Sequence, residues 1–276
     1  MLALLKFLPR VLLSRAFGRL AGCRRPRWFA RLSIALFHGL YPRIDLSEAA
    51  RGKPSEYGSL QDFFTRELAP GARTVGHSSM VAPSDGAFGE SGEIRSGTVF
   101  QAKGVPYSVS DFLQDADLAH ELELGAFATI YLAPWNYHRV HHPVSGNLVG
   151  ARHIPGDLWP VNRSAVEGIP GLFVRNERAW VAVRNEHGLA VAVLVGAYNV
   201  GSIRLSDCPQ PTGNLRGGWT PAQPVPVRAG NLLGVFEMGS TVVVLVDRGM
   251  RKAAAGLAWP LAGASVRMGR SLPFPP

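Results

Sequence analysis

The sequence predicts an α+β fold, with basic amphipathic helices at the N-terminus followed by a β-rich domain of barrel- or sandwich-like form. Apolar residues in the first 44 positions are spaced by threes and fours, as in helices with one apolar side. From about residue 74, short β-branched and aromatic runs alternate with turns rich in Gly, Pro, Asn and Asp. A hydrophobic fraction of 46% in 276 residues supplies a substantial core. We therefore expect a helical region over 1–70 and a β-rich domain over 71–276.

All of the excess positive charge lies in the first 44 residues. This stretch has nine basic and no acidic residues, whereas the remaining chain has 20 of each. The basic residues are Lys6, Arg10, Arg15, Arg19, Arg24, Arg25, Arg27, Arg31 and Arg43. Two helices broken near Pro26 would place Leu, Phe and Trp opposite this charge, as in segments that lie in an anionic membrane surface. The alternative is that they pack on their own domain and leave the basic face in water.

Other roles for this stretch fit the sequence less well. Arg10, Arg15 and Arg19 interrupt the apolar core that a signal peptide requires, and the lipoprotein-like box at 20–23 lacks such a core. A nucleic-acid-binding arm would also be basic, but the interleaved Leu and Phe favour lipid. The longest uncharged runs, 124–138 and 188–203, are too short for a membrane-spanning helix. We therefore expect a peripheral membrane protein that does not bind nucleic acid.

Two further helices and many strands are expected after this stretch. Ser59 and Asp62 resemble a capping box that begins a helix with Phe63, Phe64 and Leu68 on one face, ending at 70–71. A short helix opens over 108–113. The expected strands are 87–94, 97–101, 127–132, 139–142, 148–153, 173–174, 179–183, 189–195, 201–204, 233–237 and 241–246.

A weak internal repeat bears on the form of the β-rich domain. Residues 83–86 (PSDG) and 143–146 (PVSG) lie 60 positions apart, and each precedes a strand-like run. They fit the pseudo-symmetric halves of a barrel or sandwich, but they also fit two unrelated turns of common composition.

The usual nucleotide-binding, hydrolase and metalloprotease motifs are absent. The chain has no G-x-x-x-x-G-K-[ST], no G-x-G-x-x-G opening a helix, no H-E-x-x-H and no G-x-S-x-G. Its two cysteines, Cys23 and Cys208, form neither a disulfide framework nor a C-x-x-C pair. A secreted scaffold held by disulfides is therefore excluded.

Three of the eight histidines, His138, His141 and His142, fall within five positions. On a helix, His138 could share a face with either of the others and bind zinc. Val140 and Pro143 disfavour a helix, however, and no Cys or carboxylate is nearby in sequence. A purely structural cluster is a second interpretation, and we favour the third, acid–base catalysis.

Two other segments suit catalysis, although each alone is typical of a turn. Asp85 lies in a tight turn, where Asp commonly hydrogen-bonds its own backbone. Ser240 follows Gly239, which can adopt strained backbone conformations, between two strand-like runs. Together, Asp85, His141 and Ser240 provide the acid, base and hydroxyl that make an activated nucleophile.

In this combination and order, the segments resemble bacterial phosphatidylserine decarboxylase, a membrane-associated, self-processing enzyme with a pyruvoyl group. The resemblance extends over nearly the whole chain. Beyond the basic start, it rests on residues 62–66 (DFFTR), 82–86 (APSDG), 103–104 (KG), 107–108 (YS), 137–141 (YHRVH), 155–158 (PGDL), 161–162 (VN), 172–178 (LFVRNER), 195–197 (VGA) and 239–241 (GST). Met238 stands where the family usually has Leu, and it is an apolar replacement of similar size.

The resemblance implies that the chain cuts itself between Gly239 and Ser240, giving a β chain of residues 1–239 and an α chain of residues 240–276. His141 would take the proton of the Ser240 hydroxyl while Asp85 holds the imidazole in the right tautomer. The Ser240 oxygen would then attack the Gly239 carbonyl. Elimination of the resulting ester and loss of ammonia would leave a pyruvoyl group in place of Ser240, and no metal is expected.

The resemblance also implies the reaction and its setting. The pyruvoyl group would form a Schiff base with phosphatidylserine and accept the electrons released with carbon dioxide, giving phosphatidylethanolamine. His138 would position the substrate carboxylate or supply the final proton. The two chains would stay together as an αβ heterodimer, compatible with a dimer of such units. The basic helices would hold it at the cytoplasmic face of the bacterial membrane, against anionic head groups.

Three other functions are compatible with the same residues. A membrane-associated serine peptidase would use Asp85, His141 and Ser240 on other proteins and would keep Ser240 intact. A peripheral lipid-binding β-domain would not depend on His138 or His141. A pyruvoyl enzyme acting on another amino acid is the third, and the hydrophobic basic start argues against it.

Overall fold

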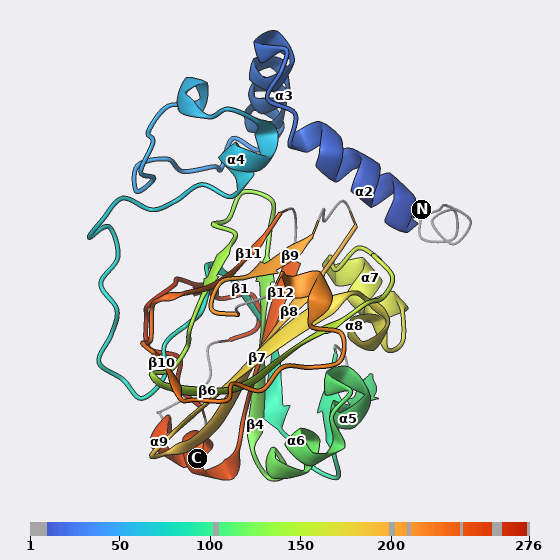
Figure 1. The fold of residues 1–276 in the computed structure, drawn as a ribbon, viewed down its shortest axis with the longest axis vertical. Helices are drawn as coiled ribbons and strands as arrows, with labels where there is room; N and C mark the ends of the chain where they lie inside the picture. The colour runs from blue at the N-terminus through green and yellow to red at the C-terminus, as the bar shows by residue number, and fades with distance from the viewer. Residues whose placement is uncertain are drawn as a thin grey trace.

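The chain folds into an N-terminal helical region and a larger domain built on an antiparallel sheet (Figure 1). The computed structural model describes residues 10–101, 105–198, 202–208, 211–237, 240–255 and 261–274, with only the backbone of Arg163 and Ser240. The combination of helices with a large antiparallel sheet confirms the predicted α+β class.

The helical region contains α2 (Arg10–Ala21), α3 (Arg27–Leu40), η1 (Pro54–Glu56) and α4 (Leu60–Phe64). Pro26 lies between α2 and α3, where the break was predicted, because its fixed φ suits the start of a helix. The Ser59 hydroxyl accepts a hydrogen bond from the Asp62 backbone N–H at 3.1 Å, which confirms the predicted N-cap of α4. The helix ends at Phe64, so Leu68 lies outside it.

A small core holds this region together, and polar contacts join it to the sheet domain. The core residues are Ala21, Ile34, Ile44, Tyr57, Leu60 and Phe63. Arg10 at the start of α2 donates to the Asp157 carboxylate at 3.0 Å and lies over the Trp159 ring. Within the described residues, no helix is both long enough and apolar enough to cross a membrane.

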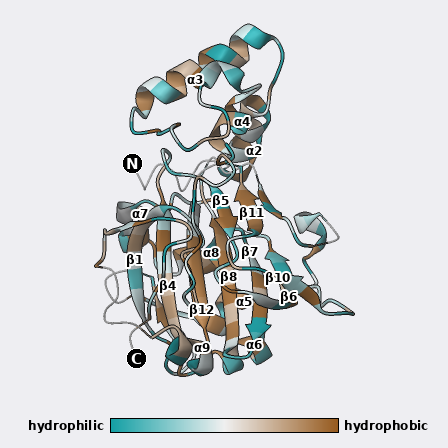
Figure 2. Ribbon diagram, turned by 90° about the vertical axis from the view of Figure 1, so that its left-hand side faces the viewer, coloured by the Kyte–Doolittle hydropathy of each residue, from teal (hydrophilic) through white to brown (hydrophobic). Residues whose placement is uncertain are grey.

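The large sheet has eight strands in the order β10-β6-β7-β8-β12-β4-β1-β13, all neighbours antiparallel. Their bounds are β1 (Gly86–Glu93), β4 (Ala126–Leu132), β6 (Gly146–Ile154), β7 (Arg178–Asn185), β8 (Gly188–Gly196), β10 (Val225–Val227), β12 (Ser240–Val246) and β13 (Ser265–Val266). The central strands are continuous apolar runs because both faces of the sheet are covered (Figure 2). Strand β12 pairs over its whole length with β4 and β8.

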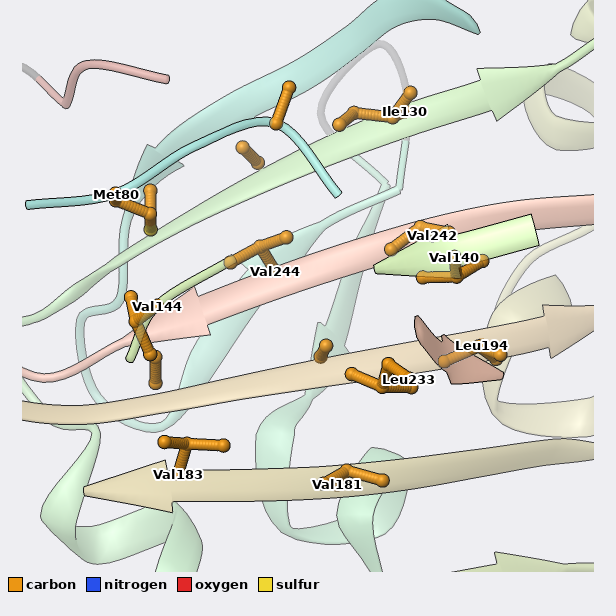
Figure 3. Close-up of a cluster of buried hydrophobic side chains, with 14 of the residues drawn as sticks. Met80, Ile130, Val140, Val144, Val181, Val183, Leu194, Leu233, Val242 and Val244 are labelled. Carbon is orange, nitrogen blue, oxygen red and sulfur yellow. The ribbon is translucent and has the colours of Figure 1, made fainter. Parts of the chain in front are cut away.

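Different elements cover the two faces. A second sheet of β5 (Arg139–His141), β11 (Leu232–Phe236) and β9 (Ile203–Leu205) packs on one face, where Val140 and Leu233 meet Val242 and Leu194 (Figure 3). The other face is covered by short helices, α5 (Val109–Leu113), α6 (Ala116–Glu121), α7 (Arg163–Gly168) and α8 (Leu172–Arg175). The remaining elements are β2 (Thr98–Phe100), β3 (Pro106–Ser108), η2 (Thr212–Asn214) and α9 (Arg248–Ala253).

The structure does not support the predicted barrel. Across the described residues, edge strands β10 and β13 pair only with β6 and β1, so the sheet stays open. Short helices cover one face of this sheet, and the separate three-stranded sheet covers the other. The turns at 83–86 and 143–146 do lead into β1 and β6, which occupy equivalent positions, each second from an edge.

Candidate active site

The predicted histidines lie around strand β5, on the segment that leaves the end of β4. This segment is a strand and not a helix, so alternate residues face opposite ways: Val140 enters the core, and Arg139 and His141 face away from it. Among the described residues, no cluster of three or more metal-ligating side chains is present. His138 and His141 have separate surroundings, with different hydrogen-bond partners.

His138 is fully buried and uses only one of its two ring nitrogens. Its Nδ1 lies 2.8 Å from the Asn136 carbonyl oxygen, and because a carbonyl only accepts, Nδ1 carries the hydrogen. Nε2 is then the bare nitrogen, buried and without a hydrogen-bond partner in the described structure. Burial, followed by the charge of Arg66, lowers the pKa of His138 to about 3. The Phe64 ring lies against the imidazole, with 3.9 Å between ring centroids.

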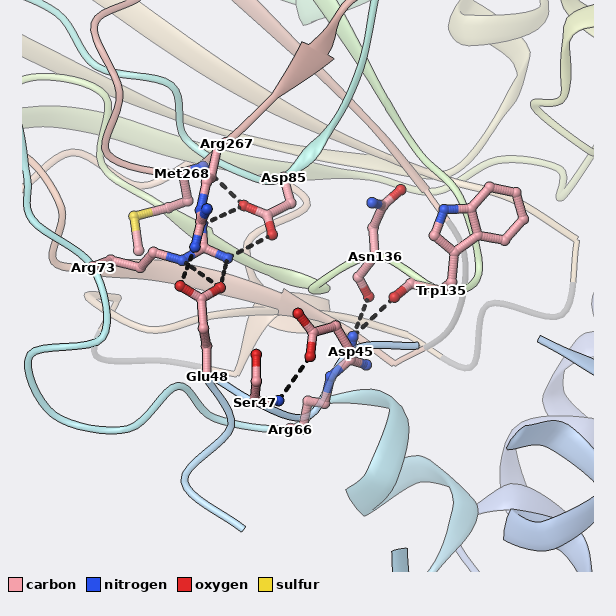
Figure 4. A network of polar contacts seen from close by, with 10 residues as sticks. All are labelled: Asp45, Ser47, Glu48, Arg66, Arg73, Asp85, Trp135, Asn136, Arg267 and Met268. Carbon is pink, nitrogen blue, oxygen red and sulfur yellow. Dashed lines mark hydrogen bonds and ion pairs between the residues drawn. The ribbon is translucent and has the colours of Figure 1, made fainter. Parts of the chain in front are cut away.

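The 62–66 segment explains how the His138 loop is held. Arg66 Nη2 donates to the carbonyl oxygens of Trp135 at 2.9 Å and Asn136 at 3.2 Å (Figure 4). Arg139 Nε in turn donates to the Thr65 carbonyl at 2.9 Å. Two segments that the sequence shows about 70 residues apart are therefore bonded together beside His138.

His141 differs because both of its ring nitrogens are occupied. Nδ1 lies 2.7 Å from the Gly230 carbonyl oxygen, and Nε2 lies 2.9 Å from the Tyr137 hydroxyl. Burial is the main cause that lowers the pKa of His141. Gly230 has φ +85°, and a Cβ there would lie 2.4 Å from Val75 Cγ2, so the position requires glycine.

Asp85 is bound to arginine and not to His141. Arg73 Nη1 and Nη2 donate to its two carboxylate oxygens at 2.8 and 2.9 Å, and the Met268 backbone N–H donates to Oδ1 at 2.9 Å (Figure 4). The Gly230 carbonyl takes the place at His141 Nδ1 that was predicted for this carboxylate. Asp85 instead acts on His141 through space, as a negative charge that raises the pKa of the imidazole.

Ser240 begins β12, with Leu132 and Gly196 as its backbone pairing partners. Met238 and Gly239 lie outside the described residues, as does the predicted cleavage bond. The flanking chain nevertheless leads to the histidines: the Phe236 N–H donates to the His138 carbonyl at 3.2 Å. Because Leu132 ends β4 just before the His138 loop, Ser240 starts its strand at the same end of the sheet.

Two cavities lie at this end of the sheet. One of about 240 Å³ is polar, and Arg43, Arg66, Arg73, Asp85 and Tyr137 are among its lining residues. The other, of about 400 Å³, has a more apolar wall formed by β1, β4 and the α7–α8 segment. It reaches Thr241, the residue after Ser240, and the buried hydroxyls of Thr241 and Thr129 have no hydrogen-bond partner in the described structure.

Sequence reasoning missed three residues of this site. Arg66 belongs to the segment 62–66, which was noted only as part of a resemblance and not as a contact of His138. Tyr137 adjoins the histidines, but nothing in the sequence predicted its hydrogen bond to His141. Gly230 is one of 31 glycines, and its carbonyl contributes through the backbone, which no side-chain pattern reveals.

Comparison with known proteins gives a consistent result. Residues 60–272 match the family model for phosphatidylserine decarboxylase. The phosphatidylserine decarboxylase proenzyme of Anaeromyxobacter sp. (strain K) is 39% identical over 276 residues, covering 97% of this chain and 95% of that protein. The proenzyme of Delftia acidovorans is 39% identical, with 96% and 94% covered, and that of Shewanella sp. (strain W3-18-1) is 42% identical, with 88% and 87% covered. The matched range includes all four predicted catalytic residues.

Proposed function

We propose that this chain, which belongs to the phosphatidylserine decarboxylase family, is a self-processing carboxy-lyase that makes phosphatidylethanolamine from phosphatidylserine. The observation that carries the proposal is a pair of histidines, His138 buried and His141 half-buried, at the end of the sheet where Ser240 begins its strand. One has a bare ring nitrogen, and the other is tied in a fixed tautomer. This arrangement suits two separate proton transfers, one in self-cleavage and one in turnover.

We assign self-cleavage to Ser240, with His141 as its base. The Gly230 carbonyl holds the hydrogen on Nδ1, so Nε2 is the nitrogen that takes the Ser240 hydroxyl proton once the Tyr137 hydroxyl releases it. The Ser240 oxygen then attacks the Gly239 carbonyl, and the chain is cut into residues 1–239 and 240–276. The negative charge of Asp85 favours the protonated imidazole of His141, and its carboxylate accepts a hydrogen bond from the Met268 backbone N–H.

The residues present fit a pyruvoyl group at position 240. Strand β12 is paired on both sides, by β4 and β8, so a new chain end at 240 would be held rigidly at the edge of the core. Nε2 of His138, which has no hydrogen-bond partner in the described structure, lies in the loop next to the start of β12. The pyruvoyl carbonyl supplies the electron acceptor that lets carbon dioxide leave. His138 contributes to turnover by contacting the substrate carboxylate or transferring the final proton.

The two chains would remain one unit after the cut. The α chain contains β12 and β13, and every pairing partner of these strands belongs to the β chain. The six residue pairs on each side of β12 from Thr241 to Val246 involve no atom that the cleavage removes. We therefore propose an αβ heterodimer, with association into a dimer of such units as a compatible further step.

The helical region suits a peripheral position on the cytoplasmic face of the membrane. Trp28, Leu32, Leu36 and Leu40 recur every four residues along α3 and are 50–74% exposed. Arg27 and Arg31 lie on the same helix. An exposed apolar row flanked by arginines binds an anionic lipid surface by apolar burial and charge together.

The test is to incubate the purified wild-type protein and Ser240→Ala with phosphatidylserine vesicles. We expect the wild type to consist of two chains and to release phosphatidylethanolamine, and Ser240→Ala to stay uncut and inactive. Ser55→Ala, at an exposed position of η1, is the matched control and should behave as wild type. A cut in Ser240→Ala would refute the cleavage mechanism. Peptide hydrolysis by an uncut wild type would favour a serine peptidase.

A further inference from the structure

The Asn136 carbonyl oxygen accepts two hydrogen bonds, and together they determine the tautomer of His138. Arg66 Nη2 lies 3.2 Å from this oxygen, and His138 Nδ1 lies 2.8 Å from it. The turn that presents the carbonyl is closed by its own contacts. The Asn136 side chain accepts from the Ala133 N–H at 2.8 Å, and the Asn136 N–H donates to the Ala133 carbonyl at 2.9 Å.

Arg66 is an unusual residue to find in this place. Its side chain is buried, with only 5% of the residue exposed, and none of the described carboxylates lies within ion-pair distance of it. A buried guanidinium without an ionised partner is costly, so its retention here calls for a specific role. Its hydrogen bonds go to the two backbone carbonyls of the His138 loop.

Two ion pairs hold other charged groups of this region. Arg139 is bound to Glu67 at 2.6 Å, and Asp85 is bound to Arg73 at 2.8 Å. From α4, the imidazole meets the uncharged Phe64 ring, and from β11 the Phe236 N–H donates to the His138 backbone carbonyl. Arg66 is therefore the charge that acts on His138, and a positive charge there opposes protonation of the ring.

We propose that Arg66 is a positioning residue that fixes His138 in the Nδ1–H form, leaving Nε2 as a proton acceptor. The guanidinium orients the Asn136 carbonyl toward Nδ1 and disfavours an imidazolium. His138 therefore starts turnover by accepting a proton at Nε2 and not by donating one. The catalytic consequence, although not the assignment itself, rests on the proposed function.

This state gives a balanced path for one proton. The substrate arrives with a protonated amine, and Nε2 takes one proton from that ammonium, so the amine becomes a nucleophile and His138 becomes an imidazolium. The same proton is later returned from Nε2 to the carbon that has lost carbon dioxide. His138 ends in the neutral state in which it began, and the product leaves as a free amine that takes its remaining proton from water.

The test uses the uncut Ser240→Ala protein, so that its result does not depend on activity. In ¹⁵N-histidine NMR, His138 should appear as the Nδ1–H tautomer and stay neutral from pH 7 to pH 5. Arg66→Gln should raise the proton affinity of His138 by roughly tenfold or more and mix the two tautomers. Arg66→Lys should keep the proton affinity of His138 within about threefold of wild type, because the positive charge remains. The fraction of the Nδ1–H tautomer should fall, because a single ammonium group cannot replace the planar guanidinium that donates to both carbonyls.

The matched control is Arg139→Gln, since Arg139 also bridges the two segments but does not contact Asn136. Its His138 signals should keep the wild-type tautomer and titration. An Nε2–H tautomer in the Ser240→Ala parent, or an unchanged His138 in both Arg66 variants, would overturn the assignment. Should Arg66→Gln fail to fold, the tautomer shift in Arg66→Lys decides the question.

Turnover by the processed enzyme gives the second readout. For Arg66→Gln, the pH at which kcat falls on the acid side should rise by as many pH units as the His138 titration measured by NMR. KM for phosphatidylserine should stay within about threefold of the wild-type value. An unmoved acid limb alongside a shifted titration would refute the acceptor role of His138. A wild type that cuts itself but decarboxylates no phosphatidylserine would refute the proposed function and leave the NMR assignment standing.

Discussion

The surroundings of His138 and His141 differ sharply, although the two residues are only three positions apart. The helical region covers His138, through the Phe64 ring and the Arg66 guanidinium, and one ring nitrogen is left bare. The sheet domain encloses His141, through Gly230 and Tyr137, and both nitrogens are bonded. A bonded histidine in a fixed tautomer suits a reaction that occurs once, whereas a bare buried nitrogen suits a site that must receive substrate repeatedly.

This difference also connects turnover with the helices that we propose bind the membrane. Phe64 contacts Phe37 of α3, with 5.9 Å between ring centroids, and it also lies against His138. The region that we assign to the lipid surface therefore forms the wall of the turnover site. Among the described residues, the His141 ring contacts Tyr137 and Gly230 and neither α3 nor α4, so processing and turnover should respond differently to changes in the two regions.

The largest effect is expected from His141→Ala. Loss of the base should slow self-cleavage by about 10²–10⁴-fold, so that the protein accumulates as one chain. Gel analysis over time measures this directly, and His187→Ala, at a half-exposed position, is the matched control. Normal cleavage in His141→Ala would show that His141 is not the base for self-cleavage.

His138→Ala should show the opposite pattern. We expect two chains at the wild-type rate, because His141 and its partners are untouched, and decarboxylation reduced by about 10²-fold or more. Phosphatidylethanolamine release, normalised to the amount of α chain, is the measurement. If turnover by the cut variant equals that of wild type, His138 has no part in the reaction.

Asp85→Asn should slow processing less than loss of His141 does. The change removes the negative charge that favours protonated His141 and leaves Arg73 with Glu48 alone. We expect cleavage slower by roughly tenfold or more, with little change in turnover once the chain is cut. Glu48→Gln, which also removes a partner of Arg73, is the control and should have the weaker effect on cleavage. Equal rates in the two variants would show that Asp85 acts only through Arg73.

Acidification should destabilise the uncut protein because of His138. Burial holds the pKa of His138 at about 3, below the ordinary value of 6.5, so the unfolded chain binds more protons between these two pH values. Stability is therefore lost as pH falls through this window, by about 2 kcal/mol for this one group between pH 7 and pH 5. Denaturant unfolding of Ser240→Ala at both pH values tests this, and a companion His138→Gln change should shrink the difference. An equal loss with and without His138 would contradict the assignment of its pKa.

The smallest effect is expected at the helical surface. Replacing Leu32 and Leu36 by Ser removes two exposed apolar side chains and should weaken binding to anionic vesicles by about tenfold or more. Self-cleavage should stay at the wild-type rate. Vesicle sedimentation measures the binding, and Leu261→Ser, at an exposed position in the sheet domain, is the control. Unchanged sedimentation of the double variant would show that α3 is not the membrane contact.

The sequence predicted the elements whose pattern is strong. The runs at 127–132, 189–195 and 241–246 are β4, β8 and β12 to within two residues at either end, since strands covered on both faces are continuously apolar. The run at 173–174 is helical instead: α8 starts after Gly171, which is in the left-handed region at φ 61°, and four residues are too few to show a helical period. Strands β3 and β10 were not predicted, because each has only three residues and contains a proline, Pro106 or Pro226, which argues against a strand except at a sheet edge.

The site was predictable in its residue types but not in its contacts. The segments around Asp85, His138, His141 and Ser240 were found from their residue types, and their individual roles came from the resemblance to a family. Which group bonds which nitrogen could not be found, because Gly230 acts through a carbonyl and Arg66 contacts His138 across about 70 residues of chain. Such contacts depend on how the helical region packs on the sheet, which local patterns do not specify.

The intact mass of freshly purified wild-type protein tests the central claim most directly. We predict two chains divided between Gly239 and Ser240, with the 37-residue α chain lighter by one ammonia than its form with N-terminal serine. That result would establish the cut and the pyruvoyl group together. A single chain near 29.7 kDa that stays uncut with phosphatidylserine vesicles would contradict the account.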